Sequence, residues 1–171
     1  MAVTTTRDED AIKRALELTL RETLREDLAR RDKLRAVRAA TELGVTQVRL
    51  ADVLGVTQPA VTVMLKRQPL SAPLIPMGHS GATPYEVAER YAAGLIDRDA
   101  MRAELGGWDY APLDRTADLA DDISVVDPQS FDGVEMAVHR GLIDLDDYGV
   151  IAKAYEARVL AGGLLGVIDA R

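Results

Sequence analysis

The chain lacks cysteine and has few aromatic residues and histidines. Without cysteine, disulfides and thiolate metal sites are excluded, and a reducing cytoplasm is the expected location. Phe and Trp occur once each and His twice among 171 residues, so Leu, Val and Ala must form the core. No apolar run approaches the roughly 20 residues of a membrane span, and the N-terminus is too charged for a signal peptide. We therefore expect a helical protein that does not enter a membrane.

The net charge of −7 is divided unevenly along the chain. Residues 1–68 contain 13 Lys/Arg and 10 Asp/Glu, a balance of +3, whereas residues 69–171 contain 8 and 18, a balance of −10. One interpretation is that an acidic surface only keeps the protein in solution. The other is that the two halves meet different partners, because binding phosphate needs only a local basic face.

Residues 8–43 contain no Gly or Pro and predict a long N-terminal helix. Leu or Ile recurs there at every fourth position from Ile12 to Leu28. A four-residue step drifts by about 40° per repeat, so the stripe winds round the helix and is not a sustained heptad seam. The stripe either packs against the chain's own domain or forms a dimer, and both alternatives stay open.

The charged residues 30–33 indicate either a break in this helix or a solvated face. A second helical unit is expected from Leu34, and it stops at Gly44, a residue suited to the position just past a helix end. Thr46 is then expected to cap the next helix.

Residues 47–67 predict two short helices that cross steeply, a helix-turn-helix. Ala51 is small where the second helix must approach the first, and Gly55 stands at the turn, where a positive φ favours glycine. Thr57 caps the second helix, with Pro59 in its first turn. The apolar residues expected to be buried together are Leu50, Leu54, Val56, Val61 and Met64.

A second helix of this kind lies in the DNA major groove and presents its N-terminal turn and one face to the bases. The side chains expected nearest the bases are Gln58, Pro59, Ala60, Thr62 and Val63. Gln58 has the amide geometry for a bidentate pair with adenine, and the methyl groups of Ala60 or Thr62 suit a thymine methyl. The side chains expected on phosphates are Gln47, Arg49, Thr57, Lys66 and Arg67.

From Leu34 to Lys66 the chain resembles the Cro/phage-repressor class of helix-turn-helix proteins. The pattern of that family runs LxxLRxxxGLTQxxLAxxLGVSxxxIS, and the corresponding residues here are LRAVRAATELGVTQVRLADVLGVTQPAVT. In phage repressors the glutamine that opens the first motif helix often holds a phosphate, and one that opens the second often reads a base. The resemblance assigns these roles to Gln47 and Gln58, and it covers about a fifth of the chain.

The C-terminal half contains a weak internal duplication. Residues 87–99 align with 134–146, and both copies contain the sequence Gly-Leu-Ile-Asp-x-Asp, at 94–99 and 141–146. The glycine is expected to end one helix in the left-handed conformation, and the first aspartate to cap the next. Each copy therefore predicts a helical hairpin, and the two hairpins are expected to pack as a small bundle.

Other chemistry has little support in the sequence. His79 and His139 have no nucleophile in a recognisable motif beside them, and ordinary surface or cap roles are expected. Asp144, Asp146 and Asp147 resemble part of a calcium loop, but the other ligands fall at wrong offsets, so capping is expected instead. The acidic run Asp118, Asp121, Asp122 and Asp127 indicates a solvated loop or, alternatively, a surface that mimics DNA or neutralises a toxin. We expect no catalysis, no metal and no cofactor.

The sequence therefore predicts an all-α protein in two parts. Residues 8–68 form the long N-terminal helix and the helix-turn-helix, 69–84 a Pro/Gly-rich linker, and 85–171 an acidic helical domain. We expect a transcriptional regulator that represses by occupying an operator on double-stranded DNA as a homodimer. Two alternatives stay open: an antitoxin whose acidic half binds a toxin, and an adaptor whose C-terminal half recruits another protein to DNA.

Overall fold

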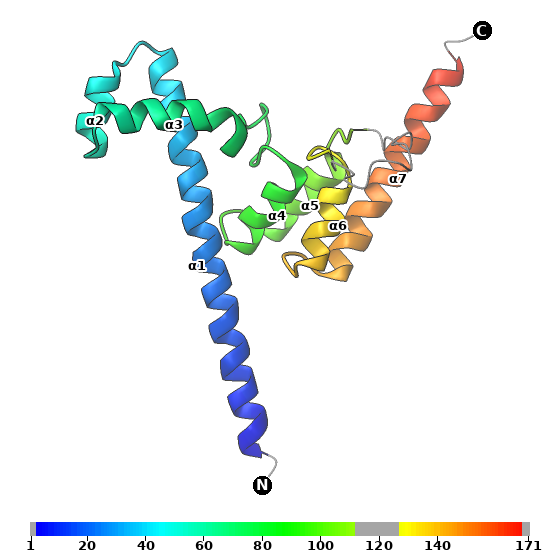
Figure 1. The fold of residues 1–171 in the computed structure, drawn as a ribbon. Coiled ribbons are helices and arrows are strands. Elements are labelled where there is room, and N and C mark those ends of the chain that lie inside the picture. Colours follow the sequence, from blue (N-terminus) through cyan, green and yellow to red (C-terminus); the bar gives the residue numbers. More distant parts are fainter. Residues whose placement is uncertain (1–2, 112–126, 169–171) are drawn as a thin grey trace, which may run out of the picture. The chain divides into compact units, whose positions relative to one another are not determined.

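The computed structural model describes the backbone of residues 3–111 and 127–168, and the side chains of residues 8–67, 71–111 and 127–160. These residues form seven helices and no strand (Figure 1), so the fold is all-α, as predicted. The chain divides into two compact units, Met1–Met77 and Gly78–Arg171. The division falls inside the predicted linker 69–84, of which the first residues belong to a helix that ends at Ser71.

Helix α1 (Val3–Glu42) is one continuous helix of 40 residues. Residues 30–33 do not break it, so the segment from Leu34 is the continuation of α1 and not a separate helix. Charged pairs one turn apart span this stretch: Arg30 lies 3.4 Å from Glu26 and from Asp27, and Arg35 lies 2.7 Å from Asp32. Such pairs favour the helix that places them together. Gly44, with φ of 85°, follows the helix end, as expected.

Helices α2 (Gln47–Leu54) and α3 (Gln58–Ser71) are joined by a three-residue turn. The Thr46 hydroxyl accepts a bond from the backbone N–H of Arg49 (3.3 Å), which caps α2 as predicted. Gly55 has φ of 64°, a left-handed conformation that costs an L side chain about 1–2 kcal/mol, and it turns the chain into α3. In the described residues, no single helix is long and apolar enough to span a membrane; α2 and residues 58–67 meet that criterion only when joined, and they are bent by 101°.

The core of the first unit is small and draws on all three helices. Val37 of α1, Leu50 and Ala51 of α2 and Val61 of α3 are buried together. Partly buried apolar residues pack against them: Ala40, Val45, Leu54, Val56 and Leu65. The prediction for this core was wrong at one residue. Leu65 is four residues after Val61, on the same face of α3, and packs on the core. Met64 is displaced by about 100° round the helix from Leu65 and lies partly exposed beside α1.

The second unit consists of the two hairpins predicted from the duplication. The first hairpin is α4 (Pro84–Ala92) and α5 (Arg98–Gly107); the second is α6 (Asp132–His139) and α7 (Leu145–Ile168). Helix α4 contacts α6 and α5 contacts α7, so equivalent helices of the two copies lie against each other. The predicted acidic segment between the copies lies largely at 112–126, outside the described residues.

The repeated turns have the predicted geometry. Gly94 and Gly141 adopt φ of 71° and 70°, and Asp97 caps α5 by accepting from the N–H of Ala100 (2.8 Å). In the second copy, Asp144 accepts from the N–H of Asp147 (2.8 Å). This backbone bond lowers the pKa of the Asp144 carboxyl, and the positive charge of Arg98 acts in the same direction. Capping therefore accounts for Asp144, whereas Asp147 pairs with Arg102.

An ion pair and a close helix approach connect the two hairpins. The fully buried Asp147 accepts a bond from Nε of Arg102 on α5 at 2.6 Å, across 45 residues of sequence. A Cβ at Gly106 would stand 3.1 Å from Cβ of Ala154, so the absence of a side chain there lets α5 and α7 approach.

The two histidines both belong to this unit, His79 half-buried beside Trp108 and His139 at a helix end. The ring of His79 lies 4.1 Å from that of Trp108, and its Nδ1 is 3.4 Å from Glu104. His139 is exposed at the end of α6. Glu104 also accepts a bond from the Ser80 hydroxyl at 2.7 Å, so His79 and Ser80 share this carboxylate.

The left-handed turn of the second hairpin leads to a testable prediction. Replacing Gly141 with Ala should lower the free energy of unfolding by about 1 kcal/mol, because φ near 70° disfavours an L residue. Gly149→Ala is the matched control, since a Cβ there meets no atom within 4 Å and Ala favours the interior of α7. It should be neutral or stabilising. Urea titration followed by the fluorescence of Trp108, the single tryptophan, reports on this unit. Equal losses in both variants would contradict the explanation.

Candidate nucleic-acid interface

The angle between α2 and α3 sets the geometry of the candidate site. The two helices are bent by 101°, within the roughly 90–120° range of helix-turn-helix units. The three-residue connection and the left-handed Gly55 produce this bend, and Leu50, Ala51 and Val61 hold it by packing in one core. Helix α3 therefore has one face buried against α1 and α2 and another left to solvent.

The solvent-facing side of α3 contains most of the predicted base-reading residues. Gln58, Pro59 and Val63 are exposed, and Val63 stands about 200° round the helix from the buried Val61. Ala60 and Thr62 are half-buried at the two margins of this face. Pro59, Ala60, Thr62 and Val63 thus lie on the outer half of α3. Gln58 stands only about 60° round from Val61 and is exposed as the first residue of the helix.

The position of Thr62 is fixed by a contact with α2. Its hydroxyl donates to Oε1 of Gln47 at 2.8 Å and lies 3.3 Å from the carbonyl oxygen of Gln58. The hydroxyl is therefore occupied inside the motif, and the methyl group is the part of Thr62 suited to an apolar contact. Because Oε1 of Gln47 accepts this bond, the Nε2 amide donors are the atoms with which Gln47 would bind a phosphate.

The predicted phosphate-binding residues surround the same pair of helices. Arg49 near the start of α2, Thr57 before α3, and Lys66 and Arg67 farther along α3 are all exposed. The segment 47–67 contains these three basic residues and one acidic residue, Asp52. The motif is therefore locally basic in a chain whose net charge is −7.

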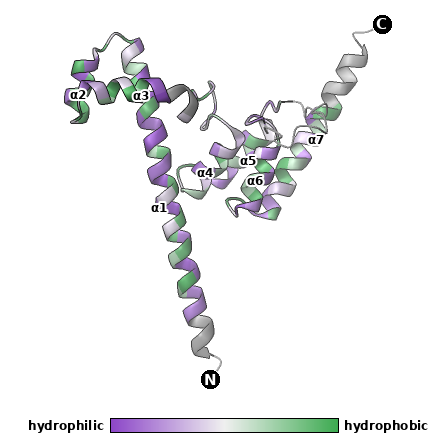
Figure 2. Cartoon of the chain, viewed as in Figure 1, coloured by the Kyte–Doolittle hydropathy of each residue, from purple (hydrophilic) through white to green (hydrophobic). Residues whose placement is uncertain are grey.

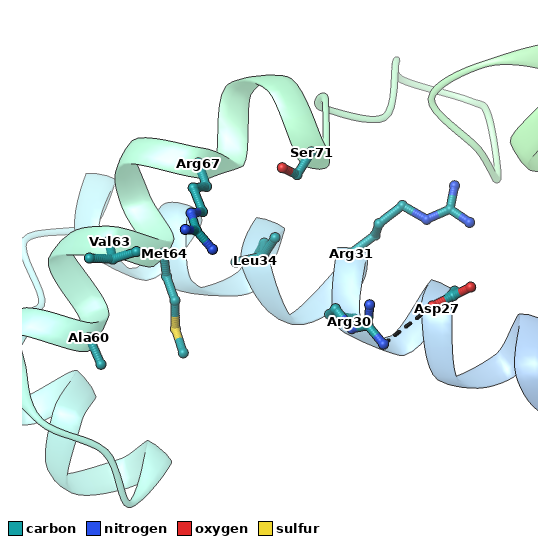
Figure 3. Close-up of a pocket in the computed structure, with 9 residues that line it drawn as sticks. All are labelled: Asp27, Arg30, Arg31, Leu34, Ala60, Val63, Met64, Arg67 and Ser71. Carbon is teal, nitrogen blue, oxygen red and sulfur yellow. Dashed lines mark ion pairs between the residues drawn. The ribbon is translucent and has the colours of Figure 1, made fainter.

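A hollow of about 850 Å³ lies between α1 and α3 on the first unit (Figure 3). We call it the α1–α3 hollow. Apolar side chains line it from both helices, and arginines stand around them. The apolar residues are Leu34, Ala60, Val63 and Met64, and the arginines are Arg30, Arg31 and Arg67. Arg67 extends from α3 toward the α1 side in Figure 3, and Arg30 is paired with Asp27 there.

The sequence alone does not place the α1 residues of this hollow in any site. Residues 30–33 form a charged patch there, and nothing within α1 indicates which of its faces α3 approaches. Three residues predicted to contact DNA, Ala60, Val63 and Arg67, also line the hollow. The two surfaces therefore adjoin along α3.

Comparison with models of known protein families, with curated proteins and with solved structures finds no match. Within the described part of the chain, no group of three or more His, Asp or Glu is placed to hold a metal ion.

The cap of α2 gives a direct test of how the motif is held. Thr46→Ala removes the acceptor for the Arg49 N–H and should cost about 1 kcal/mol, or roughly a fivefold rise in local opening. Hydrogen–deuterium exchange of peptides that cover residues 47–56 should be faster in this variant, while peptides of α4 and α5 keep their rates. Thr46→Ser retains the oxygen and should restore slow exchange. Unchanged exchange in Thr46→Ala would show that this bond does not stabilise α2.

Proposed function

We propose that this protein is a sequence-specific DNA-binding transcriptional regulator. The observation that carries the proposal is the 101° bend between α2 and α3, which leaves the outer face of α3 exposed between basic side chains. A helix of this diameter fits the major groove, and Lys66, Arg67 and Arg49 supply positive charge for the phosphates on either side. Groups suited to catalysis play no part in this mechanism: the protein acts by occupying its site.

Base readout in this proposal depends on the first turns of α3. The exposed amide of Gln58 pairs with adenine, and the methyl groups of Thr62 and Ala60 contact thymine. Val63 and Pro59 add apolar surface on the same face. Gln47, held by Thr62, donates its amide to a phosphate next to the α2 N-terminus and so fixes the register of α3 in the groove.

In this proposal the protein binds DNA as a homodimer, and α1 supplies the surface that contacts the second copy. Ile12, Leu16 and Leu20 are 60%, 65% and 42% exposed, whereas Leu24 and Leu28 farther along the stripe are buried. Hydrophobic residues recur along the N-terminal part of α1 in Figure 2. Burial against a second α1 would remove these three side chains from water, and two-fold symmetry would present two α3 helices to two half-sites.

The DNA assignment is tested by selecting binding duplexes from a random pool and measuring affinity by fluorescence anisotropy. Gln58→Ala should weaken binding to the selected duplex by about 1–3 kcal/mol and leave binding to random DNA unchanged, because only base contacts carry sequence information. An equal loss on both kinds of DNA would remove Gln58 from the base-reading role. Failure to enrich any duplex would contradict DNA binding itself.

The same assay separates phosphate contacts from base contacts. Lys66→Ala should weaken binding to all duplexes and reduce the slope of log K against log salt by about 1. Lys13→Ala is the control, since Lys13 is an exposed lysine on α1 that lies 3.9 Å from Glu17. It should leave the slope unchanged.

The dimer surface is tested by paired substitutions on α1. Leu16→Glu should convert a dimer to a monomer, because the charge would have to be buried against the partner helix. Leu18→Glu is the matched control: Leu18 is 58% exposed and lies about 200° round the helix from Leu16. Size-exclusion chromatography with light scattering gives the mass of each variant. A wild-type monomer, or dissociation by both substitutions, would contradict this surface.

A further inference from the structure

The α1–α3 hollow has two properties that DNA binding alone does not explain. Its lining combines aliphatic side chains that remain accessible with arginines at the margin. Val63 is 46% exposed, and Leu34 and Met64 are half-buried, so none of them is fully covered by the chain's own core. Phosphates would use the arginines but would gain nothing from the apolar residues.

The charges in the hollow favour an anion. Among the described residues, Arg30, Arg31 and Arg67 line it together with one carboxylate, Asp27. Arg30 lies 3.4 Å from Asp27 and also 3.4 Å from Glu26, which is outside the lining. The three arginines outnumber these two carboxylates, and the exposed Arg67, which extends from α3 toward the α1 side (Figure 3), is within reach of a bound group. A guanidinium binds a carboxylate through paired N–H donors, a stronger contact than a neutral hydrogen bond.

The size and composition of the hollow narrow the class of anion. About 850 Å³ is within the range of small-molecule pockets, roughly 300–1,000 Å³. No described residue of the lining has an aromatic ring, so stacking of a flat aromatic ligand has no partner among them. Leu34, Val63 and Met64 instead offer a flexible aliphatic surface, and methionine adapts readily to chains of varied shape.

We propose that the α1–α3 hollow binds an aliphatic carboxylate of medium chain length. The chain lies on Leu34, Val63 and Met64, and the carboxylate is held by Arg67 and the α1 arginines. Because Ala60, Val63 and Arg67 also belong to the surface proposed to contact DNA, the carboxylate and DNA exclude each other. This regulatory part rests on the proposed function: the ligand acts as an inducer that releases the operator.

Binding is tested on the full chain with decanoate, below the concentration at which it forms micelles. Methyl NMR should show the signals of Leu34, Ala60, Val63 and Met64 shifting on titration. Decanol has the same chain length without the negative charge, and butyrate has the carboxylate with a much shorter chain. Each should therefore bind at least about tenfold more weakly than decanoate. Equal binding of decanol, or shifts confined to the Ile12, Leu16 and Leu20 signals, would overturn the proposal.

Charge reversal on α1 supplies the matched comparison. The double variant Arg30→Glu/Arg31→Glu should weaken decanoate binding by about tenfold or more. Arg14→Glu/Arg21→Glu changes the net charge equally on exposed positions of the same helix outside the hollow and should bind as the wild type does. Circular dichroism of both variants checks that α1 remains folded. Equal effects of the two double variants would contradict a site at the hollow.

Competition with DNA separates this inference from the proposed function. Decanoate should raise the Kd of the selected duplex, and the duplex should raise the Kd of decanoate by the same factor. If decanoate shifts the hollow's signals but no duplex is enriched, the pocket stands and the DNA function fails. If the duplex binds and shifts these methyl signals while decanoate does not, the hollow is part of the DNA surface and the ligand proposal fails.

Discussion

The packing of Val37, Leu50, Ala51 and Val61 is the contact on which the first unit depends. Helices of 8 and 14 residues are marginal in isolation, so α2 and α3 need a surface to pack on. The C-terminal part of α1 provides that surface through Val37. With one face of α3 packed in this core, its opposite face is left to solvent. The exposure of Pro59, Val63 and Lys66 follows from the burial of Val61 and Leu65.

The second unit uses a different kind of constraint. Its hairpins are formed locally, by a left-handed glycine followed by a capping aspartate, and are joined by contacts between α4 and α6 and between α5 and α7. Asp147 is fully buried and would be costly there without a counter-charge, and Arg102 supplies it at 2.6 Å. The duplication therefore accounts for two similar hairpins, while side chains that differ between the copies hold them together.

The first unit has two adjoining surfaces, and we propose a different ligand for each of them. The outer face of α3 combines small and apolar side chains with the basic Lys66 and Arg67, as suits a groove lined by bases and phosphates. The α1–α3 hollow is apolar with a cationic margin, as suits an amphipathic anion. Residues shared between them, such as Ala60 and Arg67, would make the two ligands compete without any change in fold. Regulation would then need only differential occupancy of neighbouring surfaces.

Sequence reasoning succeeded wherever a few neighbouring residues decide the conformation. The Thr46 cap, the left-handed Gly55 and both Gly-Leu-Ile-Asp turns were predictable because backbone preference and capping act within about one helical turn. The exchange of Met64 for Leu65 in the core, the pairing of Arg102 with Asp147 and the approach of Arg30 to α3 were not. They depend on which faces of distant segments meet, and hydrophobic periodicity is too coarse to distinguish positions that differ by about 100° on a helix. The sequence by itself determined where the helices turn and are capped, and only the tertiary structure decided which of their side chains meet.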